Sequence, residues 1–329
     1  MTWSSRRVLV TGADGFIGSH LTEALVEAGA TVRTLCFYNS FGSLGWLDKV
    51  EPEVRGALDV RLGDIRDARF VEECCQEVDV VFHLAALISI PYSYQAPESF
   101  VDTNVRGTLN VLEAVRRARC ARLVHTSTSE VYGTPETVPI RESHPLRAQS
   151  PYSATKIAAE KLCEAFRCAY EIPVVILRPF NTFGPRQSIR AVIPTILLQL
   201  LRQAPEVRLG NLEPRRDLTF VSDTVAGFLA AGTVAGIEGE TIHLGTGRAE
   251  SVRDIVAVAQ RVCERDARVV VCPERVRPRH SEVMVLQSDP SRASKMLGWK
   301  AKVSLEDGLC STAEWLRTYM DRFGVDYAI

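Results

Sequence analysis

The sequence lacks the apolar run of about 18 residues that a membrane-spanning helix requires. It also lacks an excess of charge, because 39 lysines and arginines against 40 aspartates and glutamates give a formal net charge of -1. A chain so close to neutrality gives no reason to expect nucleic acid or an anionic membrane as its partner. Any anion-binding site must therefore be local. Internal repeats and low-complexity segments are absent as well.

Disulfide and metal-binding cysteine patterns are also missing. The nine cysteines include no C-x-x-C pair, and Cys74 and Cys75 are adjacent. Such spacings predict reduced thiols and no metal site. The opening residues, MTWSSRRVLVTG, contain no apolar core of signal-peptide length before the first predicted strand. Together these absences predict a cytoplasmic protein.

What the chain does contain is an alternation of apolar strands and amphipathic helices. Its 329 residues are 46% apolar and 24% charged, which is ordinary for a globular protein with a full core. We predict strands at residues 7–11, 31–37, 58–62, 78–84, 122–125 and 174–177, with helices between them, and a last helix at residues 305–323. This order predicts an α/β fold, a Rossmann-type doubly wound parallel sheet.

A glycine-rich turn, GADGFIG at residues 12–18, follows the first predicted strand and precedes an amphipathic segment at 19–28. In this context Gly12 permits a tight turn, Gly15 lets the backbone approach a pyrophosphate, and Gly18 allows close helix–strand packing. The first N–H groups of the helix would bind the phosphates. The spacing is G-x-x-G-x-x-G rather than G-x-G-x-x-G, and a purely structural turn is the alternative.

The second predicted strand ends without the acidic residue that holds the adenosine ribose in many NAD-specific Rossmann proteins. Cys36 or Phe37 occupies that place, and no adjacent arginine clearly invites a 2′-phosphate. The residues therefore leave the choice between NAD and NADP open. Asp64 is placed to bond an adenine edge, and a helix N-cap for residues 68–75 is the alternative.

Tyr152 and Lys156 are four residues apart in SPYSATK, so a helix places them on one face. A lysine cation beside a phenol favours the phenolate, which predicts a lowered pKa and a base at neutral pH. Thr128, just after an apolar strand, offers a hydroxyl to a substrate oxygen. Glu130 adds a carboxylate that a plain alcohol dehydrogenase would not need. His83 lies inside an apolar run, which favours a packed core residue over a catalyst.

Four arginines in the second half lie in loops beside prolines or glycines: Arg186, Arg216, Arg277 and Arg279. Several guanidinium groups in one cleft are suited to bidentate binding of a diphosphate, although each taken singly could be a solvated surface charge. We therefore predict a dinucleotide-binding domain of residues 1–178 and a smaller substrate-binding lobe of residues 179–329. Some elements are expected to be shared between the two.

The motifs in combination resemble the extended short-chain dehydrogenase/reductase family, and within it the nucleotide-sugar epimerases and dehydratases. They are TGADGFIG, GDIRD, HLAA, NVRGT, STSEVYG, PYSATK, RPFNTFGP, RRDLTFVSD and LGTG, and they cover nearly the whole chain. STSEVYG resembles the 4,6-dehydratases, most of all GDP-mannose 4,6-dehydratase. Residues 38–48, YNSFGSLGWLD, resemble the legionaminic-acid-pathway dehydratases, which act on nucleotide-linked N-acetylglucosamine.

The resemblance implies three sets of site residues and no metal. The catalytic set is Thr128, Ser129, Glu130, Tyr152 and Lys156. The cofactor, NAD with NADP not excluded, would contact Gly12, Gly15, Phe16, Ile17, Gly18, Tyr38, Asn39, Ser40, Asp64, Ile65, Leu84, Ala85, Ala86, Asn104, Thr126, Tyr152, Lys156 and Pro179. The nucleotide-sugar substrate would contact Ser89, Asn181, Arg186, Arg216 and Arg277.

The implied reaction is an NAD(P)-dependent 4,6-dehydration of UDP- or GDP-N-acetylglucosamine to a 4-keto-6-deoxy sugar. Tyr152 takes the proton of the C4 hydroxyl, Thr128 bonds that oxygen, and Glu130 removes the proton at C5. Ser129 stands where dTDP-glucose enzymes have an acidic aspartate, so Glu130 would act as both base and acid. The alternatives are a UDP-glucuronate decarboxylase, a nucleotide-sugar 4-epimerase and a non-enzymatic dinucleotide-binding protein. Relatives form homodimers through helices matching residues 100–119 and 152–170, so we expect a homodimer.

Overall fold

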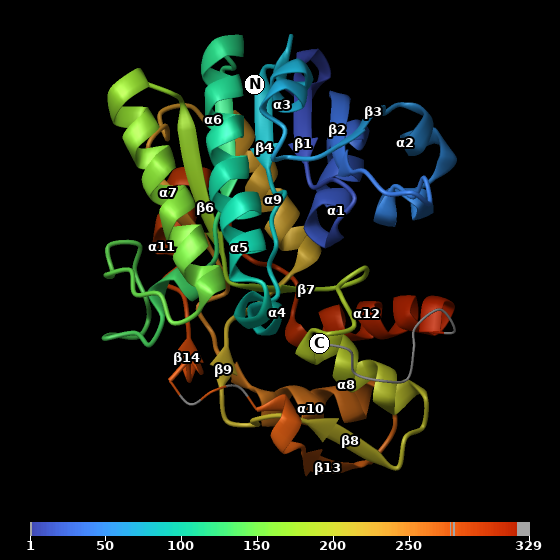
Figure 1. The fold of residues 1–329 in the computed structure, drawn as a ribbon. Coiled ribbons are helices and arrows are strands. Elements are labelled where there is room, and N and C mark those ends of the chain that lie inside the picture. The colour runs from blue at the N-terminus through green and yellow to red at the C-terminus, as the bar shows by residue number, and fades with distance from the viewer. Residues whose placement is uncertain (1, 277, 279, 321–329) are drawn as a thin grey trace.

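A central parallel sheet of seven strands organises the described residues, which are 2–276, 278 and 280–320 of the computed structural model (Figure 1). Its order is β11-β6-β5-β4-β1-β2-β3, with every neighbouring pair parallel. The strands are β1 Arg7–Thr11, β2 Thr31–Phe37, β3 Asp59–Gly63, β4 Val80–His83, β5 Arg122–Thr126, β6 Val174–Pro179 and β11 Thr241–Leu244. This arrangement confirms the predicted Rossmann-type sheet.

Helices cover both faces of this sheet because its strands are apolar on both sides. Successive residues of β1 show the alternation: Val8 and Val10 pack toward one face and Leu9 toward the other. The first face is covered by α1 Phe16–Glu27, α9 Val221–Thr233 and α11 Ser291–Leu297. The second is covered by α3 Ala68–Cys75, α6 Gly107–Ala118 and α7 Pro151–Tyr170.

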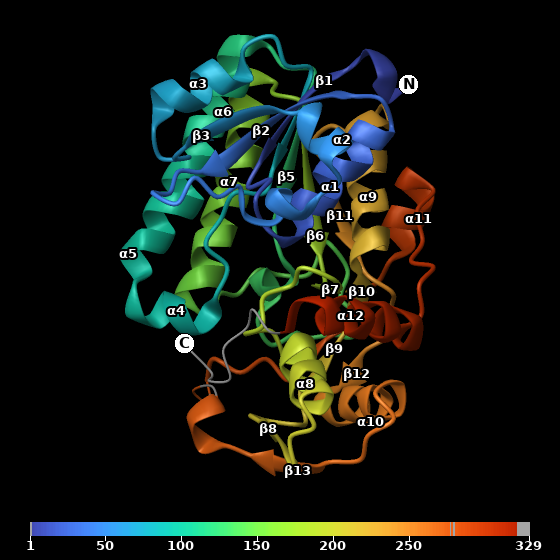
Figure 2. The same cartoon turned by 90° about the vertical axis from the view of Figure 1, so that its right-hand side faces the viewer.

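The second half of the chain contributes to the sheet and also builds a smaller lobe. Strand β11 and helix α9 pack with the first half, whereas α8 Val192–Leu201, α10 Val252–Val262 and α12 Leu305–Tyr319 share a separate core. Figure 2 shows these three helices and the strand pair β8 Glu206–Leu209 and β13 Arg268–Val271 beneath the sheet. Between the two parts lie β7 Asn181–Phe183 with β10 Leu218–Phe220, and β9 Arg215–Arg216 with β12 Glu250–Ser251 and β14 Val285–Leu286.

Three predicted helices differ from the observed ones. Helix α1 begins at Phe16, because Gly15 is its N-cap residue, three residues earlier than predicted. The helix predicted over 100–119 is three elements: α5 Pro97–Phe100, a π-helical segment η3 Val101–Arg106, and α6. The last helix, predicted to reach residue 323, ends as an α-helix at Tyr319, and the predicted end lies outside the described residues.

Short elements connect these units: η1 Trp3–Ser5, η2 Gly45–Lys49, α2 Pro52–Gly56, α4 Ile90–Gln95, η4 Ser129–Tyr132 and η5 Pro273–Arg275. Within the described residues, no helix combines the length and the apolar character needed to cross a membrane. The same residues contain no cluster of histidine, cysteine and acidic side chains suited to a metal ion.

Candidate active site

The glycine-rich loop has the tight turn and the close packing that its spacing predicts. Gly12 has φ +71°, and a Cβ atom there would lie 2.8 Å from the backbone nitrogen of Ala85. A Cβ atom on Gly18 would lie 2.1 Å from the carbonyl oxygen of Gly12, so only glycine allows α1 to approach β1 this closely. Gly15 is exposed at the start of α1, where pyrophosphate binding stays a prediction.

A buried histidine connects the ends of β1 and β4 beside this loop. His83 Nδ1 lies 2.8 Å from the hydroxyl of Thr11, and its Nε2 lies 3.0 Å from the hydroxyl of Thr108. Burial lowers the pKa of His83 to about 3, so the ring is neutral. The Thr11 hydroxyl also accepts from the backbone N–H groups of Leu84 and Ala85. His83 is therefore a core residue, as predicted, and it helps to shape the loop after β4.

Asn104, in the π-helical segment, holds the same loop against α7. Its Oδ1 accepts from the backbone of Leu87 at 2.8 Å, and its Nδ2 donates to the Leu87 carbonyl at 2.9 Å and to Thr155 at 3.0 Å. Both donor hydrogens and one oxygen lone pair are thus used within the protein. The extra residue that a π-turn accommodates brings this amide into register with the loop.

Helix α7 presents Tyr152 and Lys156 on one buried face, with 7% and 5% of their surfaces exposed. The helix begins here because Ser150 and Ser153 form a reciprocal capping box and Pro151 occupies the first turn. The Lys156 ammonium donates to the carbonyl of Thr126 at 2.6 Å, at the end of β5. Burial lowers the pKa of Lys156 to about 8, against the opposing influence of Glu160.

The predicted lowering of the Tyr152 pKa by Lys156 is wrong for this structure. Burial raises the pKa of Tyr152 above its usual range, a hydrogen bond with the Thr128 side chain lowers it, and the charge of Glu130 raises it further. Lys156 is not among these influences, because its ammonium is directed to the Thr126 carbonyl. The sequence spacing correctly predicted a shared helix face, but burial depends on the tertiary packing around that face.

The short helix η4 brings the other predicted catalytic residues to Tyr152. Thr128 caps η4 by accepting from the backbone N–H of Glu130 at 3.2 Å, and its side chain bonds Tyr152. Ser129 is buried, with 2% of its surface exposed. Thr128, Glu130 and Tyr152 therefore form one cluster: a phenol, a hydroxyl and a carboxylate at the C-terminal end of β5.

Behind this cluster lies a buried ionic network that the sequence analysis did not identify. Arg178, at the end of β6, donates to Glu160 of α7 at 2.8 and 2.6 Å and to the hydroxyl of Tyr132 in η4. His243 of β11 bonds the same hydroxyl. The signal was the position of Glu160, one helical turn after Lys156 on the same face.

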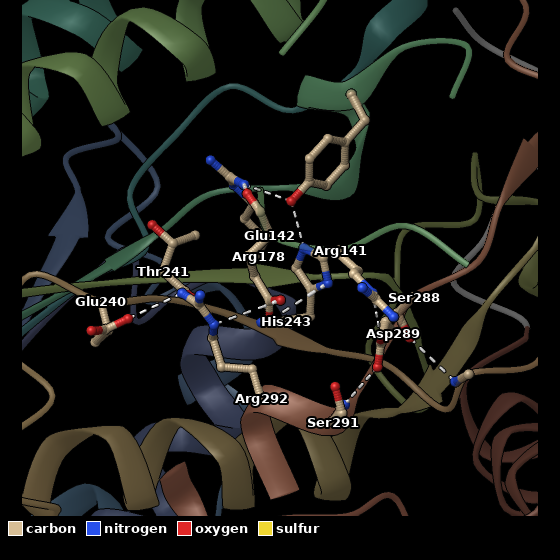
Figure 3. Close-up of polar contacts among 12 residues, drawn as sticks. Arg141, Glu142, Arg178, Glu240, Thr241, His243, Ser288, Asp289, Ser291 and Arg292 are labelled. Atoms are coloured by element: carbon tan, nitrogen blue, oxygen red, sulfur yellow. Dashed lines mark hydrogen bonds and ion pairs between the residues drawn. The ribbon is translucent and has the colours of Figure 1, made fainter. Parts of the chain in front are cut away.

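Figure 3 shows the outer end of this network. Glu142 accepts from the backbone N–H of His243 at 3.0 Å, and Arg292 bonds Glu240 at 3.0 Å and the Thr241 carbonyl at 3.1 Å. Glu142, Glu240, Thr241 and Arg292 border a polar pocket of about 420 Å³ beside β11. The network thus spans from the edge of the sheet to the helix that carries Tyr152.

The predicted substrate residues differ in whether their polar side-chain atoms already have partners within the protein. Ser89 caps α4, and its hydroxyl accepts from the backbone of Tyr92. Asn181 in β7 has a buried side-chain oxygen without a hydrogen-bond partner among the described residues, and its contact with a substrate stays a prediction. Arg186 instead bonds Glu23 and Ser19 of α1. Arg216 pairs with Glu282 at 3.4 Å. Arg277 lies outside the described residues, as does the loop arginine Arg279.

The helix-cap alternative for Asp64 is wrong, because Asp67 caps α3 by accepting from two backbone N–H groups. Asp64 instead forms an ion pair with Arg66 at 2.6 Å. Asn39 uses its amide within its own turn, accepting from the backbone of Phe41 and Ser43 and donating to Ser43. Whether Asp64 and Asn39 contact a cofactor stays a prediction.

A doubly wound sheet with a glycine-rich turn and a Tyr-x-x-x-Lys helix at its C-terminal edge defines a dinucleotide-binding protein of the extended short-chain dehydrogenase/reductase class. Residues 9–312 match the family described as GDP-mannose 4,6 dehydratase, and the chain belongs to that family.

Relatives of this chain include both epimerases and dehydratases. The UDP-glucose 4-epimerase of Mycolicibacterium smegmatis is 35% identical over 94% of this chain and 98% of its own length. The UDP-glucuronic acid 4-epimerase of Bacillus cereus, solved with UDP-glucuronic acid and NAD, has a TM-score of 0.87 and 29% identity over 95% of this chain and 99% of that one. An NAD-dependent NDP-hexosamine 5,6-dehydratase of tunicamycin biosynthesis has a TM-score of 0.83 and 29% identity over 95% and 98%.

Proposed function

We propose that this protein is an NAD-dependent nucleotide-sugar 4,6-dehydratase that forms a 4-keto-6-deoxy sugar nucleotide. The observation that carries the proposal is the placement of Glu130 beside the Tyr152 and Thr128 pair. A tyrosine and a hydroxyl residue suffice for oxidation at C4. A carboxylate in the same cluster supplies the base that elimination from C5 and C6 needs.

The described residues fit a dinucleotide. The glycine-rich loop leaves no space for side chains at Gly12 and Gly18. At the end of β5 the hydroxyls of Thr126 and Ser127 are buried and have no hydrogen-bond partner among the described residues, so they are free to bond a ligand. Bound NAD would accept a hydride from C4 of the sugar and return it at C6.

The protein side chains supply the proton transfers. Tyr152, once ionised, takes the proton of the C4 hydroxyl, an ionisation that the Thr128 bond favours and burial opposes, and Thr128 bonds that oxygen. The resulting 4-keto group acidifies the proton at C5, which Glu130 removes. Because Ser129 is a poor acid, Glu130 also returns a proton to the hydroxyl that leaves C6 as water. Lys156 orients the cofactor ribose.

A 4-epimerase is the second candidate, and the 35% identical UDP-glucose 4-epimerase favours it. An epimerase uses Tyr152 and Thr128 for the same oxidation and returns the hydride to the opposite face of C4. Glu130 then has no proton to remove at C5. The two functions therefore differ in what Glu130 does.

For the substrate we propose UDP- or GDP-N-acetylglucosamine. The sequence resemblance of residues 38–48 suggested this sugar, and the NDP-hexosamine dehydratase neighbour supports a hexosamine. In the structure, however, residues 38–48 follow β2 and contact the glycine-rich loop through the bond from Trp46 to the Asp14 carbonyl. They lie on the cofactor side, so the choice of sugar rests on sequence resemblance. A cytoplasmic homodimer that pairs through α6 and α7 completes the proposal.

The test is incubation of the purified protein with NAD and each sugar nucleotide in deuterated water, followed by mass spectrometry and NMR. We expect a 4-keto product lighter by one water, with deuterium at C5, and we expect Glu130→Gln to abolish it while C4 oxidation persists. Unchanged mass with inverted C4 would establish the epimerase instead. Release of carbon dioxide from UDP-glucuronate would establish a decarboxylase.

A further inference from the structure

The end of β2 presents an unusual arrangement for a protein that binds NAD. In Rossmann proteins the adenosine ribose lies at this place, and an acidic residue at the strand end bonds its hydroxyls. Here β2 ends at Phe37, whose side chain is 58% exposed, and Tyr38 follows with 65% exposed. The strand itself therefore offers no carboxylate.

A carboxylate reaches the same place from the glycine-rich loop. Asp14 lies between Gly12 and Gly15, and its Oδ2 accepts from the backbone N–H of Phe37 at 3.2 Å. Its carboxyl group is thus held at the C-terminal end of β2, although it belongs to the turn after β1. Burial raises the pKa of Asp14, and the Phe37 N–H lowers it.

The backbone of Asp14 is held as firmly as its side chain. Its carbonyl oxygen accepts from the N–H of Trp46 at 3.0 Å. Gly45, with φ +59°, lets η2 approach so closely that a Cβ atom there would lie 2.4 Å from this same oxygen. The Trp46 ring packs edge-on against Trp315 of α12, with centroids 5.2 Å apart. The segment after β2 therefore fixes Asp14 in its position.

Three arginines on β2, on β3 and in the loop after β3 are already paired with carboxylates. Arg33 and Arg61 both bond Asp59, at 2.7 and 2.8 Å, and Arg66 bonds Asp64. A 2′-phosphate at the end of β2 would therefore meet the Asp14 carboxylate, with each of these three guanidinium groups committed elsewhere.

We propose that Asp14 is the specificity-determining residue for the cofactor: it accepts a hydrogen bond from the adenosine ribose and excludes the 2′-phosphate of NADP. This inference rests on the proposed binding of NAD, and it assigns to the glycine-rich loop a role that Rossmann proteins usually give to the end of the second strand. The choice between NAD and NADP, which the sequence left open, would thus be made by a residue in the motif GADG.

The test compares binding of NADH and NADPH to the full chain by titration calorimetry and nicotinamide fluorescence. Asp14→Asn keeps an oxygen for the Phe37 N–H and removes only the charge. We expect the wild-type protein to prefer NADH, and Asp14→Asn to move the affinity ratio toward NADPH by about 10-fold or more, because like charges brought together are costly. Asp48→Asn is the matched control, because Asp48 lies in the same segment and bonds Ser43 and the Leu44 N–H. It should leave the ratio unchanged.

An Asp14→Asn protein that binds NADH normally and keeps the wild-type ratio would overturn this inference and leave the proposed function intact. A ratio that moves equally in Asp48→Asn would also overturn it, because the effect would then be general electrostatics. Wild-type protein that binds neither dinucleotide would overturn the proposed function itself.

Discussion

Glu160 and Arg178 form a bidentate ion pair in the interior, with side chains 0% and 4% exposed. Glu160 lies one helical turn after Lys156, and Arg178 is the next-to-last residue of β6, so the pair fixes α7 to the strand beside it. Tyr132 extends the contact to η4, which carries Glu130. The relative positions of Tyr152 and Glu130 thus depend on the ion pair between Glu160 and Arg178.

We expect Glu160→Gln to destabilise the fold by about 3 kcal/mol or more, because it leaves the Arg178 guanidinium buried without its counter-charge. Urea unfolding followed by circular dichroism measures this change. Glu164→Gln is the control on the same helix, since Glu164 pairs with Lys161 at the surface. That pair should contribute less than about 1 kcal/mol. Equal effects of the two substitutions would contradict the assignment.

The hydrogen bond between Thr128 and Tyr152 predicts a shift in the pH dependence of the reaction. The bond lowers the pKa of Tyr152, whereas burial raises it. Tyr152 acts as a base only when ionised, so the rate rises with pH through its pKa. Thr128→Val removes the bond and should move this rising limb to higher pH, whereas Thr128→Ser should restore it. A limb that stays in place in Thr128→Val would show that the hydroxyl acts only on the substrate.

Asn181 offers a test that separates ligand binding from folding. Its buried side-chain oxygen has no partner among the described residues, so Asn181→Leu removes an unsatisfied acceptor and should leave stability unchanged or raised. We expect KM for the sugar nucleotide to rise about 10-fold, the equivalent of one hydrogen bond to a charged group. Thermal melting and steady-state kinetics measure the two effects.

Asn110→Leu is the matched control, because Asn110 donates to the carbonyl of Ile65 and lies on α6. It should lower stability without changing KM. If Asn181→Leu lowered stability and left KM unchanged, Asn181 would be a structural residue.

Three buried histidines predict a loss of stability in acid. Burial lowers the pKa of His83 and His243 to about 3, and that of His125 well below its usual range. An unfolded histidine titrates near pH 6.5, so below that value the unfolded chain binds more protons than the folded one. Stability is therefore complete above pH 6.5 and falls as the pH drops toward 3, by about 1.4 kcal/mol per pH unit for each histidine.

Urea midpoints at about pH 7.5, 6.5 and 5.5 measure this dependence, and the midpoint should fall slightly between the first two values and more steeply below pH 6.5. His125 is the informative position, because both of its ring nitrogens lack a hydrogen-bond partner among the described residues. Because His125→Leu removes one of the three histidines, the stability of this variant should fall less steeply below pH 6.5, by about 1.4 kcal/mol per pH unit. A midpoint that does not change between pH 7.5 and 5.5 would contradict the prediction.

Local sequence predicted the parts of the fold that local forces determine. Strands β1 and β2 have the predicted bounds because short apolar runs between turn residues define them. Tyr152 and Lys156 share a face because helical periodicity alone requires it. The glycine-rich turn was readable for the same reason, since its conformation depends on the backbone of Gly12.

The features that the sequence did not predict depend on contacts between residues far apart in the chain. The bond between Arg186 and Glu23 joins residues 163 apart, so a loop arginine suited to phosphate became a contact with α1. The raised pKa of Tyr152 follows from packing around α7, which spacing does not encode. The sequence analysis assigned Asp14 no role, and only the structure places its carboxyl group at the end of β2, a strand to which it does not belong.

The pairing of β11 with β6 has a consequence for the order of folding during synthesis. Residues 174–179 are entirely buried in the finished protein, and their outer neighbour, Thr241–Leu244, leaves the ribosome more than 60 residues later. Until then the nascent chain carries an open, apolar strand edge of the kind that associates with other chains. A fragment ending at residue 178 would keep that edge permanently, so we expect it to aggregate. The two lobes predicted from the sequence, residues 1–178 and 179–329, are therefore not expected to fold as separate units.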